Sequence, residues 1–175
     1  MLPVVDIAAP DAWLFFWTTG PCLPQAFSII AASGFKYSGS GFVWVKLRRA
    51  CDTKQLRLLP ITEADLHTGL GHTTRKNAEF CLLARRGRPQ RLAADVREVV
   101  LEPVREHSRK PTEAYRRIER FCAGPRIELF VRERRPGWIS WGDEIDRFDA
   151  APGPRDEEAL KPALANALAP LEAAS

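Results

Sequence analysis

Residues 124–144 read GPRIELFVRERRPGWISWGDE, and the interpretation of the whole chain starts from this stretch. Its apolar core, residues 127–131, predicts a buried strand, and strands of α/β folds often end at a ligand. This strand runs directly into Arg132 and is followed by Trp138 and Trp141, without the glycine fingerprint of a dinucleotide site. The stretch therefore raises the question of which ligand an arginine-rich strand end would hold.

Upstream of this stretch, strand-like and helical patterns alternate. Residues 12–17 form a continuous apolar run, which predicts a strand buried on both faces, as in a parallel sheet. Apolar residues over 23–33 have helical spacing that Gly34 closes, and residues 42–46 predict a second strand. This order of strand, helix and strand predicts a βαβ unit.

The same alternation continues through the middle of the chain. Residues 80–84 predict a third strand, and residues 99–101 are a short apolar piece that suits an edge strand. A helix is expected from Pro111 at its first position, and Gly124-Pro125 ends it before the strand at 127–131. The chain therefore predicts an α/β fold with a second βαβ element.

Length and charge indicate one domain and a phosphate-rich partner. The chain has 175 residues, enough for one domain with a core, and a net charge of +4. Residues 75–135 hold 17 basic against 9 acidic side chains, whereas the rest of the chain holds 9 against 13. A basic block of this kind favours nucleic acid, although a solvated arginine-rich surface, typical of a GC-rich genome, explains the charge equally well.

Cysteine, histidine and apolar patterns exclude several classes. The four cysteines lie about 30 to 40 residues apart without a CxxC pair, which argues against a zinc knuckle and a disulfide framework. His67, His72 and His107 lack the spacing of metal ligands, so no metal site is expected. Neither a membrane span of roughly 20 apolar residues nor a leader peptide is visible. We expect a cytoplasmic protein without a membrane partner.

Three segments carry candidate site residues. In the first, residues 105–111, Ser108 and Lys110 precede a helix whose free N–H groups would bind a carboxylate or phosphate. Alternatively, Ser108 only caps the helix and the basic residues face water. In the second, residues 71–79, Arg75 and Lys76 would contact nucleic-acid phosphates.

The third segment is the strand end itself. A carboxylate there can hold ribose hydroxyls, and an aromatic ring can pack against a base. Alternatively, Trp138 and Trp141 belong to the core and the carboxylates pair with the arginines. The candidates in this segment are Glu128, Phe130, Arg132, Asp143 and Glu144.

Three longer runs, taken together, resemble the MT-A70 family of adenine-N6 methyltransferases, which act on mRNA in eukaryotes and on DNA in bacteria and phages. The runs are AWLFFWTTGPCLPQAFSIIAASGFKYSGSGFVWVK, GLGHTTRKNAEFCLLARRGRP and REHSRKPTEAYRRIERFCAGPRIELFVRERRPGWISWGDE, and the resemblance covers about residues 3–147. It implies a three-layer, circularly permuted Rossmann-like fold that uses S-adenosylmethionine. The bacterial and phage members match more closely, so DNA is preferred over RNA as the partner.

The resemblance also implies roles for the candidate residues. Ser108 and Lys110 would meet the methionine part of the cofactor, and His72 and Glu79 would lie beside the substrate adenine. Arg75, Lys76 and Arg105 would contact the nucleic acid. The adenosine end of the cofactor would meet Glu128, Phe130 and Arg132, and its ribose or methionine contacts would be completed by Asp143 and Glu144.

The family's catalytic Asp-Pro-Pro-Trp does not occur in these 175 residues, and the segment from Met1 resembles the part of the family that lies C-terminal to that motif. We therefore expect residues 1–148 to be a methyltransferase-like domain that lacks its first strand, and residues 149–175 to be a linker and a weakly helical tail. Two functions stay open: an adenine-N6 methyltransferase, or a non-catalytic nucleic-acid-binding or partner subunit. A homodimer or a heterodimer is compatible with either function.

Overall fold

The computed structural model describes residues 4–51, 60–71, 73–145 and 147–148. The chain divides into two compact units, one formed by residues 10–122 and one that includes the described residues 4–9 and 123–148. The tail expected at 149–175 and His72 lie outside the described residues. That residues 1–148 act as one domain stays a prediction.

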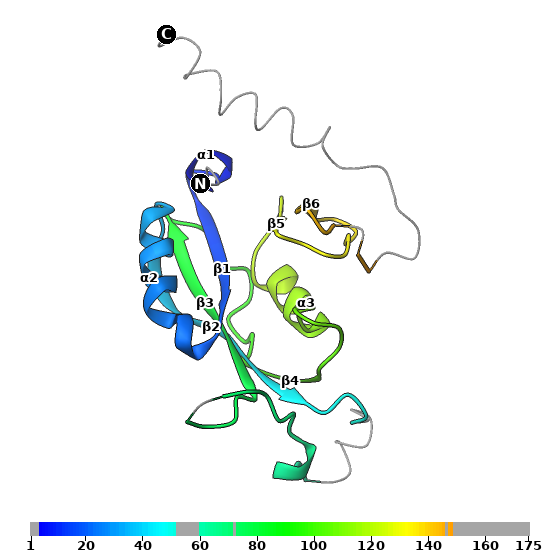
Figure 1. The fold of residues 1–175 in the computed structure, drawn as a ribbon. Coiled ribbons are helices and arrows are strands. Elements are labelled where there is room, and N and C mark those ends of the chain that lie inside the picture. Colours follow the sequence, from blue (N-terminus) through cyan, green and yellow to red (C-terminus); the bar gives the residue numbers. More distant parts are fainter. Residues whose placement is uncertain (1–3, 52–59, 72, 146, 149–175) are drawn as a thin grey trace. The chain divides into compact units, whose positions relative to one another are not determined.

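Four strands of residues 10–122 form one sheet in the order β1-β3-β2-β4 (Figure 1). They are β1 (Ala12–Thr18), β2 (Lys36–Leu47), β3 (Ala78–Arg86) and β4 (Val99–Pro103). All four lie where the apolar runs predicted strands, and β4 is an edge strand as expected. Because β3 is antiparallel to β1 and β2, and β4 is parallel to β2, the strands β1, β2 and β4 run in one direction.

The expectation of a parallel sheet is wrong, because β3 lies between β1 and β2 and pairs antiparallel with both. The run Trp13 to Trp17 is half-buried and lies on the edge strand β1. Continuous apolarity arises because helices cover both faces of the sheet, and that covering does not depend on strand direction. The strand–helix–strand succession β1, α2, β2 is nevertheless present, with β3 inserted between its two strands.

Helices α2 (Leu23–Ala32) and α3 (Thr112–Phe121) lie on opposite faces of this sheet (Figure 1). A 3₁₀ turn, Gly20–Cys22, precedes α2, and a second 3₁₀ turn, Glu63–Asp65, follows β2. Helix α2 ends as predicted, since Gly34 adopts φ 76° in the left-handed region. On the other face, Phe121 of α3 packs edge-on against Trp13 and Phe15, with ring centroids 5.1 and 5.7 Å apart.

The second unit contains α1 (Val4–Ile7), β5 (Ile127–Leu129) and β6 (Ile139–Trp141). The strand expected at 127–131 is shorter and only half-buried, because Phe130 adopts φ 61° and leaves the extended conformation. Strand β5 pairs in parallel with β6, in a sheet separate from that of β1–β4, so the second βαβ element is not formed. A helix–turn–strand pattern specifies the succession of elements but not the partner of the strand.

Candidate functional site

Polar and aromatic side chains gather at one edge of the four-stranded sheet. Since β1, β2 and β4 run in one direction, their carboxyl ends share an edge with the start of β3. In open α/β sheets, ligands bind at such carboxyl ends. We name the group there the edge cluster; its members are Trp17, Trp44, Lys46, Glu79 and Lys110.

The centre of the edge cluster is the carboxylate of Glu79, which is only 8% exposed. Its Oε2 lies 2.8 Å from Nζ of Lys46, and its Oε1 accepts a hydrogen bond from Nζ of Lys110. Burial raises the pKa of Glu79, but the attraction of the two ammonium groups is greater and leaves the pKa below its usual value. Glu79 is therefore an ionised carboxylate held between two cations.

Each of the two lysines also lies over a tryptophan ring. Nζ of Lys46 is 4.8 Å from the ring centroid of Trp44, and Nζ of Lys110 is 5.4 Å from that of Trp17. Both distances are within the range of cation–π attraction. Because an ammonium group has three donors, Lys110 keeps hydrogen-bonding capacity for an anionic ligand while it contacts Glu79.

The turn before α3 fixes where Lys110 lies. Arg105 donates a hydrogen bond of 2.6 Å to the carbonyl oxygen of Lys110, and Arg49 donates one of 2.7 Å to that of Arg105. Ser108 adopts φ 64°, and its hydroxyl lies 3.1 Å from Nδ1 of His107. Arg105, which the resemblance implies for nucleic acid, thus holds the backbone of the turn that carries Lys110.

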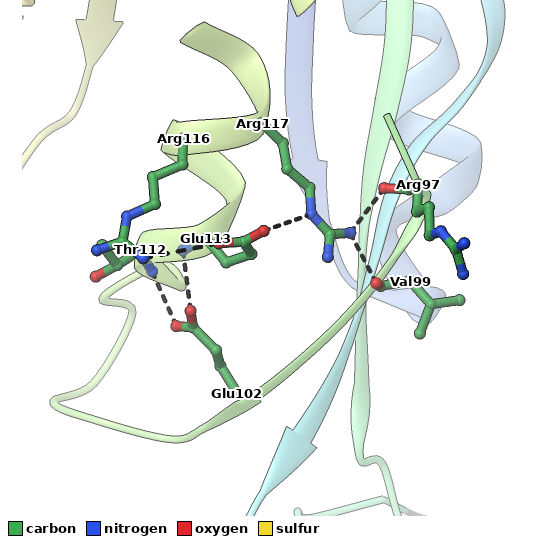
Figure 2. Close-up of polar contacts among 7 residues, drawn as sticks. All are labelled: Arg97, Val99, Glu102, Thr112, Glu113, Arg116 and Arg117. Atoms are coloured by element: carbon green, nitrogen blue, oxygen red, sulfur yellow. Dashed lines mark hydrogen bonds and ion pairs between the residues drawn. The ribbon is translucent and has the colours of Figure 1, made fainter. Parts of the chain in front are cut away.

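The N-terminus of α3 differs from the prediction, which expected free N–H groups there. Figure 2 shows that the carboxylate of Glu102 accepts hydrogen bonds from the backbone N–H groups of Thr112 and Glu113, each at 3.0 Å. Ser108 does not cap the helix either, because Pro111 occupies the N-cap position. An anion site on these two N–H groups is therefore ruled out, and any anion would bind to side chains of the turn.

Sequence reasoning missed Glu102, whose carboxylate caps a helix that begins ten residues later. Capping signals are read from the residues next to a helix, and Glu102 belongs to the strand β4. The indole N–H of Trp44 donates a hydrogen bond of 2.9 Å to the backbone carbonyl oxygen of Glu102. Glu102 thus ties the start of α3, and with it the turn carrying Lys110, to the sheet.

The segment of Arg75 and Lys76 is exposed, as expected for phosphate contacts. Nζ of Lys76 donates a hydrogen bond of 2.8 Å to the hydroxyl of Thr74. Glu79 is the second residue of the strand β3 that follows. The structure brings this predicted substrate residue into contact with Lys110, a predicted cofactor residue. The structure thus joins two candidates that the sequence had assigned to different ligands.

The second unit holds the remaining candidates. Phe130 is 70% exposed and packs edge-on against Trp141, with ring centroids 5.7 Å apart. The alternative interpretation, an arginine–carboxylate pair, is confirmed for Glu144, which contacts both Arg132 and Arg147. Hydrogen bonding from Arg132 holds the pKa of Glu144 below its usual value. Asp143 is exposed beside it.

Beside these candidates, Glu128 lies opposite Ser140 in the β5–β6 register. Ser140 is 3% exposed, and its hydroxyl lacks a hydrogen-bond partner among the described residues. A buried orphan hydroxyl of this kind can take part in a hydrogen bond with an additional group.

The described residues lack two features, a metal-binding cluster and a membrane-spanning helix. They contain no group of three or more His, Cys, Asp or Glu side chains placed to hold a metal ion. Within the same residues, no helix has the length and apolarity needed to cross a membrane. Cys81 is fully buried, and burial raises the pKa of its thiol, which excludes it as a nucleophile.

Comparison with known proteins gives consistent matches. A model of the MT-A70 family matches residues 1–144. The chain is 33% identical over 147 residues to the type II methyltransferase M.MunI of Mycoplasma sp., covering 82% of this chain and 55% of that protein. It is 31% identical over 147 residues to the human N(6)-adenosine-methyltransferase catalytic subunit METTL3, covering 81% of this chain and 23% of that protein. The chain therefore spans only part of the relatives it matches.

Proposed function

The chain belongs to the MT-A70 family, and from that premise we propose that it serves S-adenosylmethionine-dependent methylation of adenine N6 in a nucleic acid. The observation that carries the proposal is the contact between Lys110 and Glu79 at the carboxyl edge of the sheet. The resemblance implies the cofactor as the ligand of Lys110 and the substrate adenine as the neighbour of Glu79. Methyl transfer requires the cofactor and the adenine to lie next to each other. The contact between Lys110 and Glu79 joins one residue proposed for each of these two ligands.

The edge cluster fits the chemistry of the cofactor. Lys110 would bind the carboxylate of its methionine part through a charge-assisted hydrogen bond, with Glu79 holding the ammonium group in position. Ser108, which is exposed in the same turn, would add a hydroxyl contact. When bound, S-adenosylmethionine supplies the electrophilic methyl group. The partial burial of Lys110 and Glu79 strengthens these contacts, because little water competes there.

The candidates of the second unit suit an adenosine moiety. The exposed ring of Phe130 would pack against an adenine base. The carboxylates of Glu128 and Glu144 would accept hydrogen bonds from ribose hydroxyls, and Arg132 would keep that of Glu144 ionised. Asp143, which stands where the family has Asn, would complete the ribose or methionine contacts.

We propose DNA rather than RNA as the substrate. Arg75, Lys76 and Arg105, together with His72, would contact the nucleic acid, and the basic excess over residues 75–135 would supply phosphate affinity. The chain is nearly as identical to METTL3 as to M.MunI, so sequence identity does not distinguish the two substrates. A direct comparison of methyl transfer to DNA and to RNA distinguishes them. On a duplex, the target adenine must leave the base stack before it can react.

A second candidate is a non-catalytic nucleic-acid-binding subunit of the same family. The basic excess over residues 75–135 suits it as well as it suits the enzyme, because phosphate contacts need no catalytic motif. Such a subunit would support an active partner chain, in keeping with the prediction of a homodimer or heterodimer. A cytoplasmic location also stays a prediction.

The proposal is tested by two measurements on the purified chain. Calorimetric titration with S-adenosylhomocysteine is expected to give micromolar binding, and tritiated S-adenosylmethionine is expected to label adenine N6 in a DNA oligonucleotide. Cofactor binding without transfer, with transfer restored by a family member that carries Asp-Pro-Pro-Trp, would favour the subunit. A folded chain that binds no cofactor would contradict the proposed function.

A further inference from the structure

The segment before β3 is anchored at both ends to the backbone of Lys46, a member of the edge cluster. The backbone N–H of His67 donates a hydrogen bond of 2.8 Å to the carbonyl oxygen of Lys46, and the N–H of Lys46 donates one of 2.8 Å to that of Asn77. Between these two anchors, Leu70 follows His67 by three residues, so its Cα lies within about 11 Å of that of His67. Leu70 is therefore carried close to the place where Lys46 contacts Glu79.

The backbone on either side of Leu70 packs against the chain that returns towards β3. A Cβ atom added to Gly69 would overlap the carbonyl oxygen of Lys76, and one added to Gly71 would overlap that of Thr74. Because glycine has no side chain, the two stretches of backbone can approach this closely. The packing on both sides holds the backbone that carries Leu70.

The side chain of Leu70 projects into solvent beside two cations. Leu70 is 92% exposed, the largest exposed fraction among the large apolar residues that the structure describes. Arg75 and Lys76, on the returning stretch, are exposed as well. An apolar side chain on a held backbone, next to two basic residues, matches a base stack that is bordered by phosphates.

We propose that Leu70 is a wedge that enters the stack of a DNA duplex and fills the step from which the target adenine has left. Arg75 and Lys76 contact the phosphates that border this step, and the extruded adenine reaches the edge cluster beside Glu79. Leucine is one of the apolar side chains by which proteins open a base step, and the opening costs least where the base is already missing. The proposal rests on the proposed function for the identity of the nucleic acid, and it narrows that substrate to a duplex.

The test is fluorescence anisotropy with the full chain and two labelled DNA duplexes of one sequence, one intact and one with a central abasic site. The abasic site offers the wedge a step whose base is already missing, so wild type is expected to bind this duplex about tenfold more tightly, the worth of one stacking step. Leu70→Ser removes the apolar wedge and is expected to bind both duplexes equally. Leu70→Met keeps an apolar wedge and is expected to keep the preference.

Two further variants separate the wedge from its surroundings. Leu92→Ser is the matched control, because Leu92 is 61% exposed but lies between β3 and β4, at the opposite edge of the sheet. It is expected to keep the wild-type preference. Arg75→Gln is expected to weaken binding to both duplexes and to lower the dependence of log K on log salt by about 0.9, as for one phosphate contact.

Equal binding of the two duplexes by wild type would overturn the proposal, as would a preference that persists in Leu70→Ser or is lost in Leu92→Ser. Wild-type affinity and salt dependence in Arg75→Gln would overturn the phosphate contact of Arg75. Titration with S-adenosylhomocysteine contains no DNA, so it tests the proposed function separately. Cofactor binding by a chain whose duplex preference does not depend on Leu70 would remove the wedge and leave the proposed function standing.

Discussion

Two carboxylates in this chain each contact two basic side chains, but their surroundings differ. Glu79 lies between Lys46 and Lys110 and is 8% exposed. Glu144 contacts Arg132 and Arg147 at the surface of the second unit. The pKa of each carboxyl lies below its usual value, but the hydrogen bond from Arg132 is the largest influence on the pKa of Glu144, whereas burial is the largest single influence on that of Glu79.

This difference shows that similar ion pairs have different energetic consequences. An exposed pair is screened by water and salt, and its loss changes the free energy of unfolding little. In a buried group, removal of one member leaves the opposite charges without compensation in a medium that solvates them poorly. The edge cluster is therefore a place where sequence changes are costly, and the Glu144 pair is one where they are tolerated.

The largest expected effect is that of Glu79→Gln. The substitution leaves the ammonium groups of Lys46 and Lys110 without their counter-ion, and we expect the free energy of unfolding to fall by about 3 kcal/mol. Urea unfolding followed by circular dichroism measures this. A loss no larger than that in Glu144→Gln would contradict the difference between the two sites.

Acidification should also change the difference in the free energy of unfolding between wild type and Glu79→Gln. Because the folded-state pKa of Glu79 lies below the usual 4.5, the ionised group stabilises the fold above about pH 4.5. That contribution is lost as the pH falls through the lowered pKa of the folded state. We expect the stability gap between wild type and Glu79→Gln to narrow below pH 4.5; a constant gap down to pH 3 would mean that folding does not lower the pKa of Glu79.

Lys110→Ala tests the ligand role of the edge cluster. If Lys110 binds the cofactor's carboxylate, its loss weakens S-adenosylhomocysteine binding by about 1 to 3 kcal/mol, measured by calorimetry. Lys46→Ala is the matched control, since it also removes one cation from Glu79 but lies outside the turn before α3. Equal cofactor affinity in wild type and Lys110→Ala would remove Lys110 from the cofactor site.

Glu102→Ala tests the helix cap. Loss of two hydrogen bonds to the N-terminus of α3 is expected to reduce the free energy of unfolding by about 0.5 to 2 kcal/mol. Glu113→Ala, in the same first turn but with its carboxylate bonded to Arg117 and not to the helix N-terminus, should cost less (Figure 2). A larger loss in Glu113→Ala would assign the stabilisation to the Arg117 contacts.

The smallest effect is expected for Glu144→Gln. Because the Glu144 pair is exposed, its unfolding midpoint should match that of wild type in 0.5 M NaCl. If Glu144 also holds a ribose hydroxyl, cofactor affinity falls although stability does not. A marked loss of stability at high salt would show that the second unit depends on this pair.

Part of the candidate site could be predicted from the sequence. Lys110 was expected to bind an anion because it precedes a helix, and the resemblance assigned Glu79 to the substrate adenine. Their direct contact was not expected, because 31 residues separate them and no local pattern relates the two. Glu102 could not be found either, since a cap from a neighbouring strand leaves no signal near the helix it stabilises.

The sequence by itself determined where the four strands of the larger sheet and the helices α2 and α3 form, because apolar spacing and glycine or proline stops act between near neighbours in the chain. It also determined family membership, through short motifs in a constant order. Only the tertiary structure decided that β3 lies antiparallel between β1 and β2, that β5 pairs with β6, and that Glu79 joins two lysines. Strand partners and long-range ion pairs depend on how whole elements pack and exclude water, which no local stretch of sequence specifies.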